Sequence, residues 1–286
     1  MRCFITGISS FLGAQLAQRL VAGGWAVGGS VRRQGSPIPT GAFPVATIRL
    51  GEPFDKELFS GVNLVVHCAH DFGTDGFERN TMGTQTLHAA AKLSDVRRQI
   101  YVSSYSARTD ALSRYGRTKY ELEQFFLRQG ATIVRPGLVI GTGGMFGRMM
   151  RALLKSPVIP LVDGGLDLVP VIGIRDFVQA MMVILHNSGR NVYNLFNREQ
   201  VSVRSLSERI CRLAGRKPLF VGMSYRNAML LLDLAQKLHL PVPVAQDSLR
   251  SLKQNQQSIH ESDLSTLLDR ETLLDESLQF ALETRY

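Results

Sequence analysis

The sequence has few cysteines and no long apolar run, and both features narrow the class of protein. Its three cysteines, Cys3, Cys68 and Cys211, lie far apart, and none belongs to a CxxC pair. Disulfides and thiolate metal sites are therefore not expected, and a reducing, cytoplasmic compartment fits best. No stretch approaches the roughly 18 apolar residues of a transmembrane helix, and the apolar segment after Met1 is too short for a signal peptide.

Clusters of basic residues are also missing, although the chain is basic overall. A formal net charge of +9 can indicate nucleic acid, an anionic membrane or phosphorylated ligands. The sequence has no dense Lys/Arg block, no zinc-ligand spacing and no basic heptad region. We therefore expect no nucleic-acid partner and no membrane contact. A scattered basic surface is the simplest interpretation, a phosphate-bearing small molecule is the alternative, and a homodimer is left open.

The apolar pattern is typical of a globular α/β protein. Hydrophobic residues make up 44% and charged residues 20% of the 286 positions, an ordinary balance for a folded domain. Short apolar strands alternate with amphipathic helices, which predicts a doubly wound parallel sheet with both faces covered. The expected strands are 3–6, 25–31, 63–68, 99–103 and 132–135, and the expected helices are 14–22, 84–93 and 115–128.

The rhythm changes after Gly141, where glycine and proline become frequent. We therefore predict a nucleotide-binding domain at residues 1–141, with segments near 169–197 returning to the sheet. A smaller substrate-binding lobe is expected at residues 142–286. The region from Pro241 to the end is polar and is expected to be mostly helical.

A glycine turn connects the first predicted strand to the first predicted helix. Gly7 allows a tight backbone turn, and Gly13 allows the helix to pack close to the strand. The freed backbone N–H groups and the helix dipole then face a phosphate group. An ordinary strand-turn-helix without a ligand is the alternative. The predicted dinucleotide site consists of Gly7, Ser9, Ser10, Phe11, Leu12 and Gly13.

This turn resembles that of the extended short-chain dehydrogenases and reductases, the family that includes NAD-dependent epimerases and dehydratases. Thr6, Gly7 and Gly13 are similar to the TGxxGxxG pattern, with Ser10 in place of the middle glycine. The resemblance extends over roughly residues 1–215 and implies a Rossmann fold with a smaller C-terminal lobe. Further segments resemble the family in the same order: 61–70, 80–84, 134–141, 169–178 and 192–195.

The resemblance also implies an NAD(P) cofactor. Cys68, Ala69 and His70 end a segment similar to the strand that passes the cofactor. Pro136 and Leu138 lie in a segment similar to the one that flanks the nicotinamide.

Two arginines end the second predicted strand, where NAD-binding proteins usually carry an acid for the ribose. Arg32 and Arg33 are suited to pair with a 2′-phosphate through charge-assisted hydrogen bonds. We therefore predict NADP as the cofactor, with NAD as the alternative. A pair of solvated loop arginines is the competing interpretation.

Three polar residues match the catalytic set of the family. Tyr115 and Lys119 share one helix face, and Ser104 ends the preceding strand. The resemblance implies that Tyr115 is the acid/base and that Ser104, with Ser103 as fallback, orients the substrate oxygen. It also implies that Lys119 tunes Tyr115 and binds the nicotinamide ribose. At ~5 Å and an effective dielectric of ~20, the charge attraction is ~3 kcal/mol, which would lower the pKa of the phenol by ~2 units.

The expected reaction is the interconversion of a carbonyl and an alcohol by hydride transfer from the cofactor. Two alternatives remain: a nucleotide-sugar epimerase or dehydratase, and a cofactor-binding regulator or scaffold without chemistry. The segment between Ser104 and Tyr115 is shorter than is common in extended members, and in nucleotide-sugar enzymes it usually lines the substrate pocket. The partner is expected to be a small-molecule substrate, with a nucleotide sugar as one candidate.

Other chemistry-bearing residues have simpler interpretations. His67, His70 and His88 lack carboxylate or cysteine partners at ligand spacing, so we expect core or pocket positions and no metal site. For the methionines at 145, 149 and 150, core packing is favoured over an apolar substrate pocket. For the apolar stretch 229–240, packing on the C-terminal lobe is favoured over membrane or partner docking. Asn80 either helps to hold the site or serves its helix.

Overall fold

The computed structural model describes residues 1–73, 76–187, 190–238, 240, 242, 244–258 and 260–284. The chain forms two compact units. The first comprises Met1–Asp110, Arg114–Arg135 and Val178–Tyr193, and the second comprises Ala111–Ser113, Pro136–Phe177 and Asn194–Tyr286. The chain thus leaves the first unit at Pro136, before Gly141, and the segment that returns to it is shorter than 169–197.

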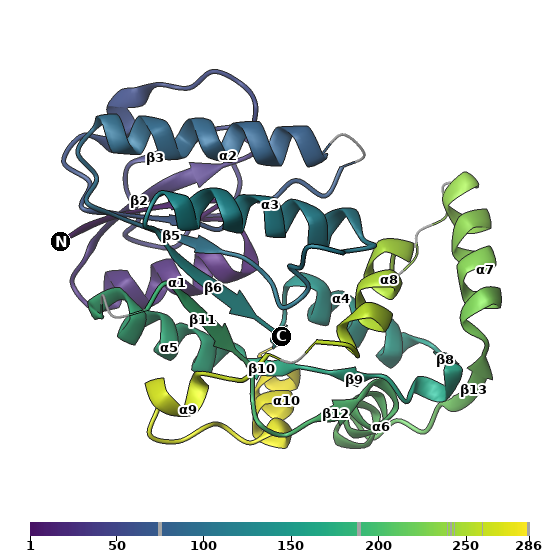
Figure 1. The fold of residues 1–286 in the computed structure, drawn as a ribbon. Coiled ribbons are helices and arrows are strands. Elements are labelled where there is room, and N and C mark those ends of the chain that lie inside the picture. Colours follow the sequence, from purple (N-terminus) through teal and green to yellow (C-terminus); the bar gives the residue numbers. More distant parts are fainter. Residues whose placement is uncertain are drawn as a thin grey trace. The chain divides into compact units, whose positions relative to one another are not determined.

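A seven-stranded sheet runs through the described part of the first unit, in the order β11-β6-β5-β4-β1-β2-β3 (Figure 1). The strands from β3 to β6 pair in parallel, which confirms the predicted doubly wound Rossmann fold. The order reverses between β1 and β4, and ligands of such sheets bind at the carboxyl ends beside this reversal. The strands are β1 (Arg2–Thr6), β2 (Ala26–Val31), β3 (Val45–Thr47), β4 (Leu64–His67), β5 (Arg98–Val102), β6 (Thr132–Pro136) and β11 (Val192–Leu195).

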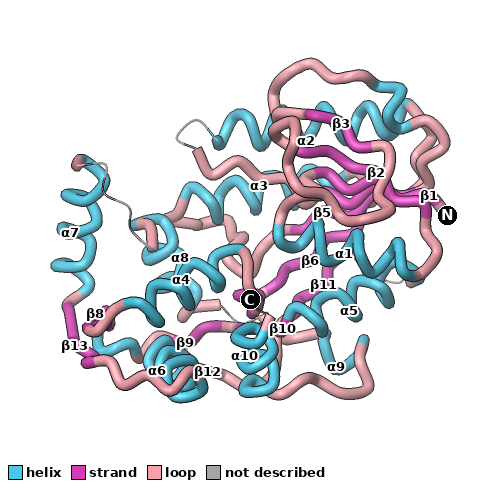
Figure 2. Tube along the Cα trace, turned by 180° about the vertical axis from the view of Figure 1, so that it is seen from behind, coloured by secondary structure: helices cyan, strands magenta, loops and turns pink. Residues whose placement is uncertain are grey.

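Helices cover both faces of this sheet (Figures 1 and 2). One face carries α1 (Phe11–Ala22) and the part of α5 (Ile174–His186) that belongs to the first unit, and the other carries α2 (Gly76–Leu93) and α3 (Arg114–Arg128). A short 3-10 helix, η1 (Lys56–Phe59), precedes β4. The core beneath α2 contains Phe4, and Tyr101 stacks on Phe126 of α3 with ring centroids 4.9 Å apart.

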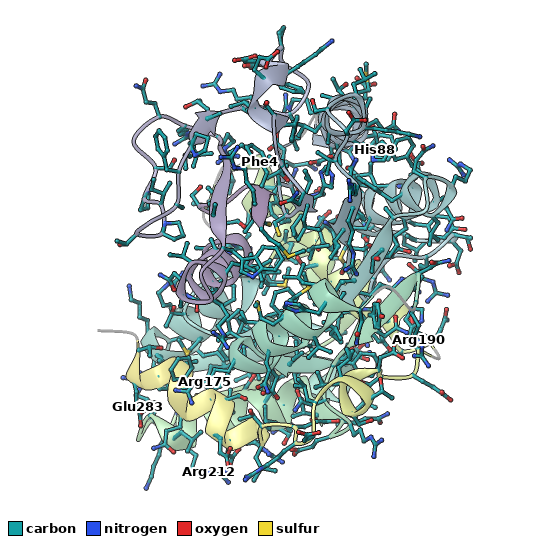
Figure 3. All side chains as sticks on the ribbon, turned by 90° about the vertical axis from the view of Figure 1, so that its left-hand side faces the viewer. Phe4, His88, Arg175, Arg190, Arg212 and Glu283 are labelled. Carbon is teal, nitrogen blue, oxygen red and sulfur yellow. The ribbon has the colours of Figure 1, made fainter. Side chains whose placement is uncertain are left out.

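Two buried histidines are tied to the core of the first unit, as predicted. His67 of β4 and His88 of α2 both contact Gln99 Oε1, at 2.8 and 3.0 Å. Burial lowers the pKa of His67 to about 4, so this ring is neutral at physiological pH. Figure 3 labels His88 together with Phe4 of β1.

The second unit is built from short strand pairs and helices. Its core includes Phe146 and Met150, so the predicted core packing is confirmed for Met150. Met149 packs against this core, whereas Met145 is 41% exposed. Its strand pairs are β7 (Leu138–Ile140) with β10 (Val171–Gly173), β8 (Val158–Val162) with β13 (Leu219–Met223), and β9 (Leu168–Val169) with β12 (Val201–Ser202). Its helical elements are α4 (Gly144–Lys155), η2 (Asp163–Gly165), α6 (Val203–Leu213), α7 (Tyr225–Lys237), α8 (Gln246–Asn255), α9 (Leu264–Leu267) and α10 (Leu274–Glu283).

The last part of the chain is largely helical, as predicted, with α8, α9 and α10 after residue 244. Pro241 itself lies outside the described residues. The apolar stretch expected at 229–240 forms most of α7, and His239 also lies outside the described residues. Several α7 leucines are exposed, among them Leu230 at 62%, so packing on the lobe covers only part of this helix. Within the described residues, no helix is both long and apolar enough to cross a bilayer.

Candidate active site

The glycine turn after β1 is tight and closely packed. Gly7 has a φ of 69°, a conformation that side chains rarely adopt. A Cβ on Gly7 would lie 2.9 Å from Ala69 Cα, and one on Gly13 would lie 2.5 Å from the Gly7 carbonyl oxygen. Ser30 of β2 holds the turn, because its hydroxyl accepts from Gly7 N at 3.2 Å and its carbonyl accepts from Ile8 N at 2.9 Å.

Ser10, which stands where the family pattern has a glycine, caps the first helix. Its Oγ accepts a hydrogen bond from Gly13 N at 3.1 Å, and a serine hydroxyl that accepts one bond keeps its proton for another acceptor. The neighbouring Ser9, Phe11 and Leu12 are half-buried. With no acidic residue in the first turn of α1, the helix dipole favours an anion here, so the turn fits a dinucleotide.

The structure brings Ser104, Tyr115 and Lys119 together in the first unit. Ser104 follows β5 and is 9% exposed, and its hydroxyl forms a hydrogen bond with the half-buried Tyr115. Lys119, one turn further along α3, is 4% exposed and its Nζ donates to the Val102 carbonyl at 2.8 Å. Its Nζ lies 5.8 Å from the centre of the Tyr115 ring.

Ser103 occupies a different environment from Ser104. It is 3% exposed, and its backbone N donates to the Val134 carbonyl at 2.7 Å, which continues the pairing of β5 with β6. Its Oγ has no hydrogen-bond partner within the described residues. The hydroxyl that meets Tyr115 is therefore the one of Ser104.

The pKa of Tyr115 shifts in the direction opposite to the one that the sequence predicted. Burial raises it above its ordinary value, and the hydrogen bond with Ser104 lowers it in part. The physical reason lies in the lysine. Burial lowers the pKa of Lys119 to about 8, and its ammonium group is directed at the Val102 carbonyl. At neutral pH Tyr115 is therefore protonated.

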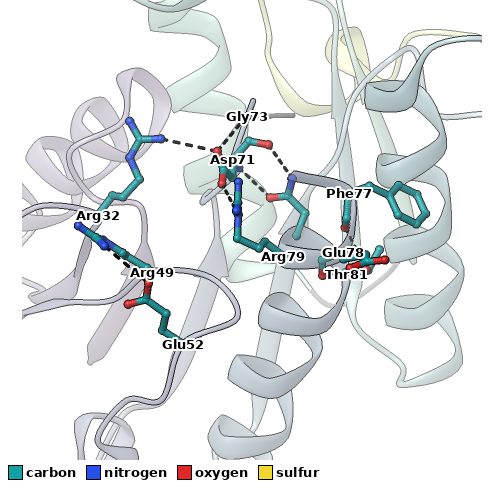
Figure 4. Close-up of polar contacts among 10 residues, drawn as sticks. Arg32, Arg49, Glu52, Asp71, Gly73, Phe77, Glu78, Arg79 and Thr81 are labelled. Carbon is teal, nitrogen blue, oxygen red and sulfur yellow. Dashed lines mark hydrogen bonds and ion pairs between the residues drawn. The ribbon is translucent and has the colours of Figure 1, made fainter. Parts of the chain in front are cut away.

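The two arginines at the end of β2 are exposed, and one of them has an acidic neighbour (Figure 4). Arg32 NH1 lies 3.7 Å from the carboxylate of Asp71, which follows β4, and Arg79 of α2 donates to the same carboxylate at 2.8 Å. The backbone N of Gly73 also donates to it at 2.9 Å. This bond, together with the two arginines, holds the pKa of Asp71 below its usual range. Arg33 is exposed, and its carbonyl accepts hydrogen bonds from the backbone N and the hydroxyl of Ser36.

The segment after β4 lies beside the glycine turn. Ala69 N donates to Thr6 Oγ1 at 3.2 Å, which ties this segment to β1. Burial raises the pKa of Cys68 to about 12, so its thiol stays protonated and unreactive. His70 is half-buried, and burial together with the charge of Lys119 lowers its pKa to about 2.

Pro136 and Leu138, expected beside the nicotinamide, belong to the second unit. Pro136 ends β6, and Leu138 begins β7, where its N donates to the Pro170 carbonyl at 2.7 Å. Gly137 between them is required by close packing, because a Cβ there would lie 2.4 Å from the Pro170 carbonyl oxygen.

Sequence reasoning missed the polar anchor around Asp71. Asn80 is 2% exposed; its Oδ1 accepts from Asp71 N at 2.7 Å and its Nδ2 donates to the Asp71 carbonyl at 2.8 Å. Asn80 thus holds the loop after β4, in addition to being part of its helix. An acid a few residues after a buried strand, near the carboxyl edge of a parallel sheet, was the available signal. Among the described residues, no three His, Cys, Asp or Glu side chains cluster in a way that could hold a metal ion.

Comparison with known proteins agrees with the fold and the turn. The profile of the NAD dependent epimerase/dehydratase family matches residues 3–195. The chain is 26% identical over 83% of its length, and 80% of the relative's, to the 4-hydroxy-2-methyl-3-oxo-4-farnesyl-3,4-dihydroquinoline-1-oxide ketoreductase of Stigmatella aurantiaca. It is 32% identical to the ceramide reductase of Caulobacter vibrioides over 56% of this chain and 53% of that one.

Among solved structures, MoeE5 in complex with UDP-glucuronic acid and NAD superimposes with a TM-score of 0.77 at 22% identity, covering 99% of this chain and 98% of that one. This likeness concerns the fold, and the family match covers more than half of the chain. The chain therefore belongs to the NAD-dependent epimerase/dehydratase family of NAD(P)-dependent enzymes.

Proposed function

We propose that this enzyme is an NADP(H)-dependent reductase that interconverts a carbonyl and an alcohol. The observation that carries the proposal is the contact of the Ser104 hydroxyl with a protonated Tyr115, beside a buried Lys119. A reductase needs a proton donor for the substrate oxygen, and a phenol whose pKa is raised by burial is protonated at neutral pH.

The residues of the first unit have separate roles in this reaction. Tyr115 gives its proton to the carbonyl oxygen as the new alcohol forms, and Ser104 donates a hydrogen bond to the same oxygen while negative charge develops on it. Lys119 contributes positive charge near Tyr115. A reduced nicotinamide, when bound, would supply the hydride for the carbonyl carbon, so that one ketone, one reduced cofactor and one proton would yield one alcohol and one oxidised cofactor.

The glycine turn and the end of β2 would hold the cofactor. The N-terminus of α1, with Gly7, Ser10 and Gly13, would receive the pyrophosphate, and Arg32 with Arg33 would receive the 2′-phosphate. This arrangement supports NADP over NAD, because the end of β2 carries two cations where a ribose-binding acid would otherwise stand.

We further propose an apolar carbonyl compound as the substrate. Two relatives are named as reductases, one of a farnesyl-substituted dihydroquinoline oxide and one of ceramide. The nucleotide-sugar epimerase or dehydratase remains the second candidate, because the segments at 169–178 and 192–195 suit such enzymes equally well.

The test is a measurement of NADPH oxidation with a panel of apolar ketones, run in parallel with UDP-glucose and UDP-glucuronic acid. We expect NADPH consumption with at least one ketone. Tyr115→Phe should lower kcat by about 100-fold or more, since proton transfer is worth that much in such sites, while the Kd for NADPH changes by less than about threefold, because the hydroxyl is not needed for cofactor binding. Near wild-type turnover by Tyr115→Phe would refute the role of the tyrosine.

A further inference from the structure

Two aromatic side chains from the loop after β4 lie against Tyr115. The His70 ring meets the Tyr115 ring edge-on, with centroids 5.1 Å apart, and the Phe72 ring lies nearly parallel to Tyr115 at 5.9 Å with an interplanar angle of 16°. His70 and Phe72 also contact each other edge-on at 4.7 Å. The three rings form one cluster, in which His70 contacts both Phe72 and Tyr115.

The backbone of this loop is firmly anchored between the two rings. Asp71, which separates His70 from Phe72, is bound through its N and its carbonyl by the buried Asn80 side chain and through its carboxylate by Arg79 and Gly73 N (Figure 4). The backbone on both sides of Phe72 is therefore held by hydrogen bonds within the protein.

Phe72 nevertheless leaves most of its surface in solvent, being 72% exposed. Contact between an exposed aromatic ring and water is unfavourable, and a large aromatic side chain held beside reacting groups is a common anchor for a ligand. Burial and the charge of Lys119 keep the His70 ring neutral, so the surface that His70 and Phe72 present beside Tyr115 carries no charge.

We propose that Phe72 is a specificity-determining residue, which stacks against a flat aromatic or conjugated ring next to the carbonyl of the substrate, with His70 as its positioning residue. This inference rests on the proposed reductase function and narrows its substrate class. The substrate oxygen must reach the Tyr115 hydroxyl, so groups attached to the carbonyl carbon lie next to the Tyr115 ring and its neighbour Phe72. A ring there gains offset-stacked contact, whereas a puckered saturated ring does not.

The experiment compares acetophenone with cyclohexyl methyl ketone, which differ in the flatness of the ring attached to the same acetyl group. KM, kcat and the Kd for NADPH are measured for the wild type, Phe72→Ala, Phe72→Tyr and Phe43→Ala. The control residue Phe43 is 82% exposed, on the loop between β2 and β3. Binding of both ketones to the NADP-loaded proteins is followed by ligand-observed NMR, which needs no turnover.

We expect Phe72→Ala to raise KM for acetophenone by about tenfold, in line with the loss of one aromatic contact, and KM for cyclohexyl methyl ketone by no more than about twofold. Phe72→Tyr and Phe43→Ala should behave like the wild type. An equal rise in KM for both ketones in Phe72→Ala would overturn the proposal. Weaker NADPH binding in Phe72→Ala alone would also overturn it, because Phe72 would then serve the cofactor. The proposal would also be overturned if the NMR measurement showed that uridine monophosphate, and not the ketone, binds in a way that depends on Phe72.

The two proposals fail in different ways. If no ketone is reduced, the reductase function is refuted, and the NMR comparison still decides whether Phe72 selects a flat ring. If ketones are reduced and both rings bind equally to the wild type and to Phe72→Ala, the reductase function stands and the role of Phe72 is refuted.

Discussion

Lys119 is a buried lysine whose ionisation bears on stability and, in the proposed reaction, on activity. Its side chain is 4% exposed, and burial lowers its pKa from 10.5 to about 8. The unfolded chain therefore binds a proton at Lys119 more tightly than the folded chain does, between about pH 8 and pH 10.5. Burial of the charged lysine lowers the free energy of unfolding, and this loss is complete below about pH 8. The loss shrinks above pH 8 and disappears as the pH rises through 10.5.

Replacing this lysine should therefore stabilise the protein while removing activity. We expect Lys119→Met to raise the free energy of unfolding by about 2 kcal/mol at pH 7, since each unit of pKa shift is worth about 1.4 kcal/mol and the lost bond to the Val102 carbonyl offsets part of it. The difference between the two proteins should shrink from pH 8 towards pH 10.5. Urea unfolding of both proteins at pH 7 and pH 10, followed by circular dichroism, measures it.

The same ionisation predicts the pH dependence of the proposed ketone reduction. Because Lys119 is cationic below a pKa of about 8 and neutral above it, kcat should be steady up to neutral pH and fall as the pH passes 8. A Lys119→Met protein that is less stable than the wild type at pH 7, or a wild-type kcat that rises above pH 8, would contradict this account of the lysine.

At the scale of single residues, the sequence identified the catalytic candidates but not their ionisation. Tyr115 and Lys119 are one helical turn apart, which the numbering alone reveals, and Ser104 ends a recognisable strand. The direction of the Tyr115 pKa depends on burial and on where the Lys119 ammonium is directed, and neither is visible in the local pattern. The stacking of Phe72 on Tyr115 is also visible only in the folded chain, because Phe72 lies in the loop after β4 and Tyr115 lies in α3.

At the scale of elements, the end of β2 and the loop after β4 together determine the charge near the predicted 2′-phosphate. Arg32 lies 3.7 Å from Asp71, and the guanidinium is 63% exposed whereas the carboxylate is 19% exposed. An anion that binds Arg32 must therefore compete with a neighbouring negative charge. This pair lowers the affinity for a 2′-phosphate relative to two unopposed arginines.

Substitutions on both sides of this ion pair should change the NADPH affinity in opposite directions. Arg32→Ala should weaken NADPH binding by about tenfold, because a hydrogen bond to a charged group contributes about 1.5 kcal/mol or more, and should leave NADH binding within about twofold. Asp71→Asn should strengthen NADPH binding by about threefold, as expected for removing one charge in a hydrated setting. Calorimetric titration of both cofactors measures these affinities.

Arg49→Ala is a matched control, because Arg49 is 60% exposed and pairs with Glu52 at 3.6 Å in the same region (Figure 4). It should leave both affinities unchanged. If the wild type binds NADH as tightly as NADPH, or if Arg32→Ala weakens both cofactors equally, the arginines do not read the 2′-phosphate.

The elements themselves were largely predictable where apolar residues formed continuous runs. The strands expected at 3–6 and 25–31 correspond to β1 (Arg2–Thr6) and β2 (Ala26–Val31), within one residue at each end. The short β3 was missed, because three residues at the sheet edge carry no clear periodicity. The ion pair between Glu123 of α3, which is fully buried, and Arg135 of β6 was also missed, since it requires knowing which strand lies beneath which helix.

At the scale of the whole molecule, the proposed reaction requires that the cofactor enter and leave in every cycle. A reductase consumes NADPH stoichiometrically, whereas an epimerase returns the hydride to its substrate and can keep its cofactor bound. Two features of the proposed cofactor site favour exchange. Ser10 stands in place of a glycine beside the predicted pyrophosphate, and Asp71 opposes the anion at Arg32.

We therefore expect freshly purified protein to carry far less than a stoichiometric amount of dinucleotide. The measurement is denaturation of the pure protein followed by chromatographic quantification of the released NAD and NADP. Incubation with NADPH and gel filtration of the same sample gives the matched comparison, because a slowly exchanging site would retain what was added. Near-stoichiometric NAD in the untreated protein, together with isomerisation of a nucleotide sugar without net cofactor use, would replace the reductase with an epimerase. Little retained cofactor and steady NADPH consumption with a ketone is the result that the proposed reductase predicts, because every turnover must release the oxidised cofactor before the next hydride can be supplied.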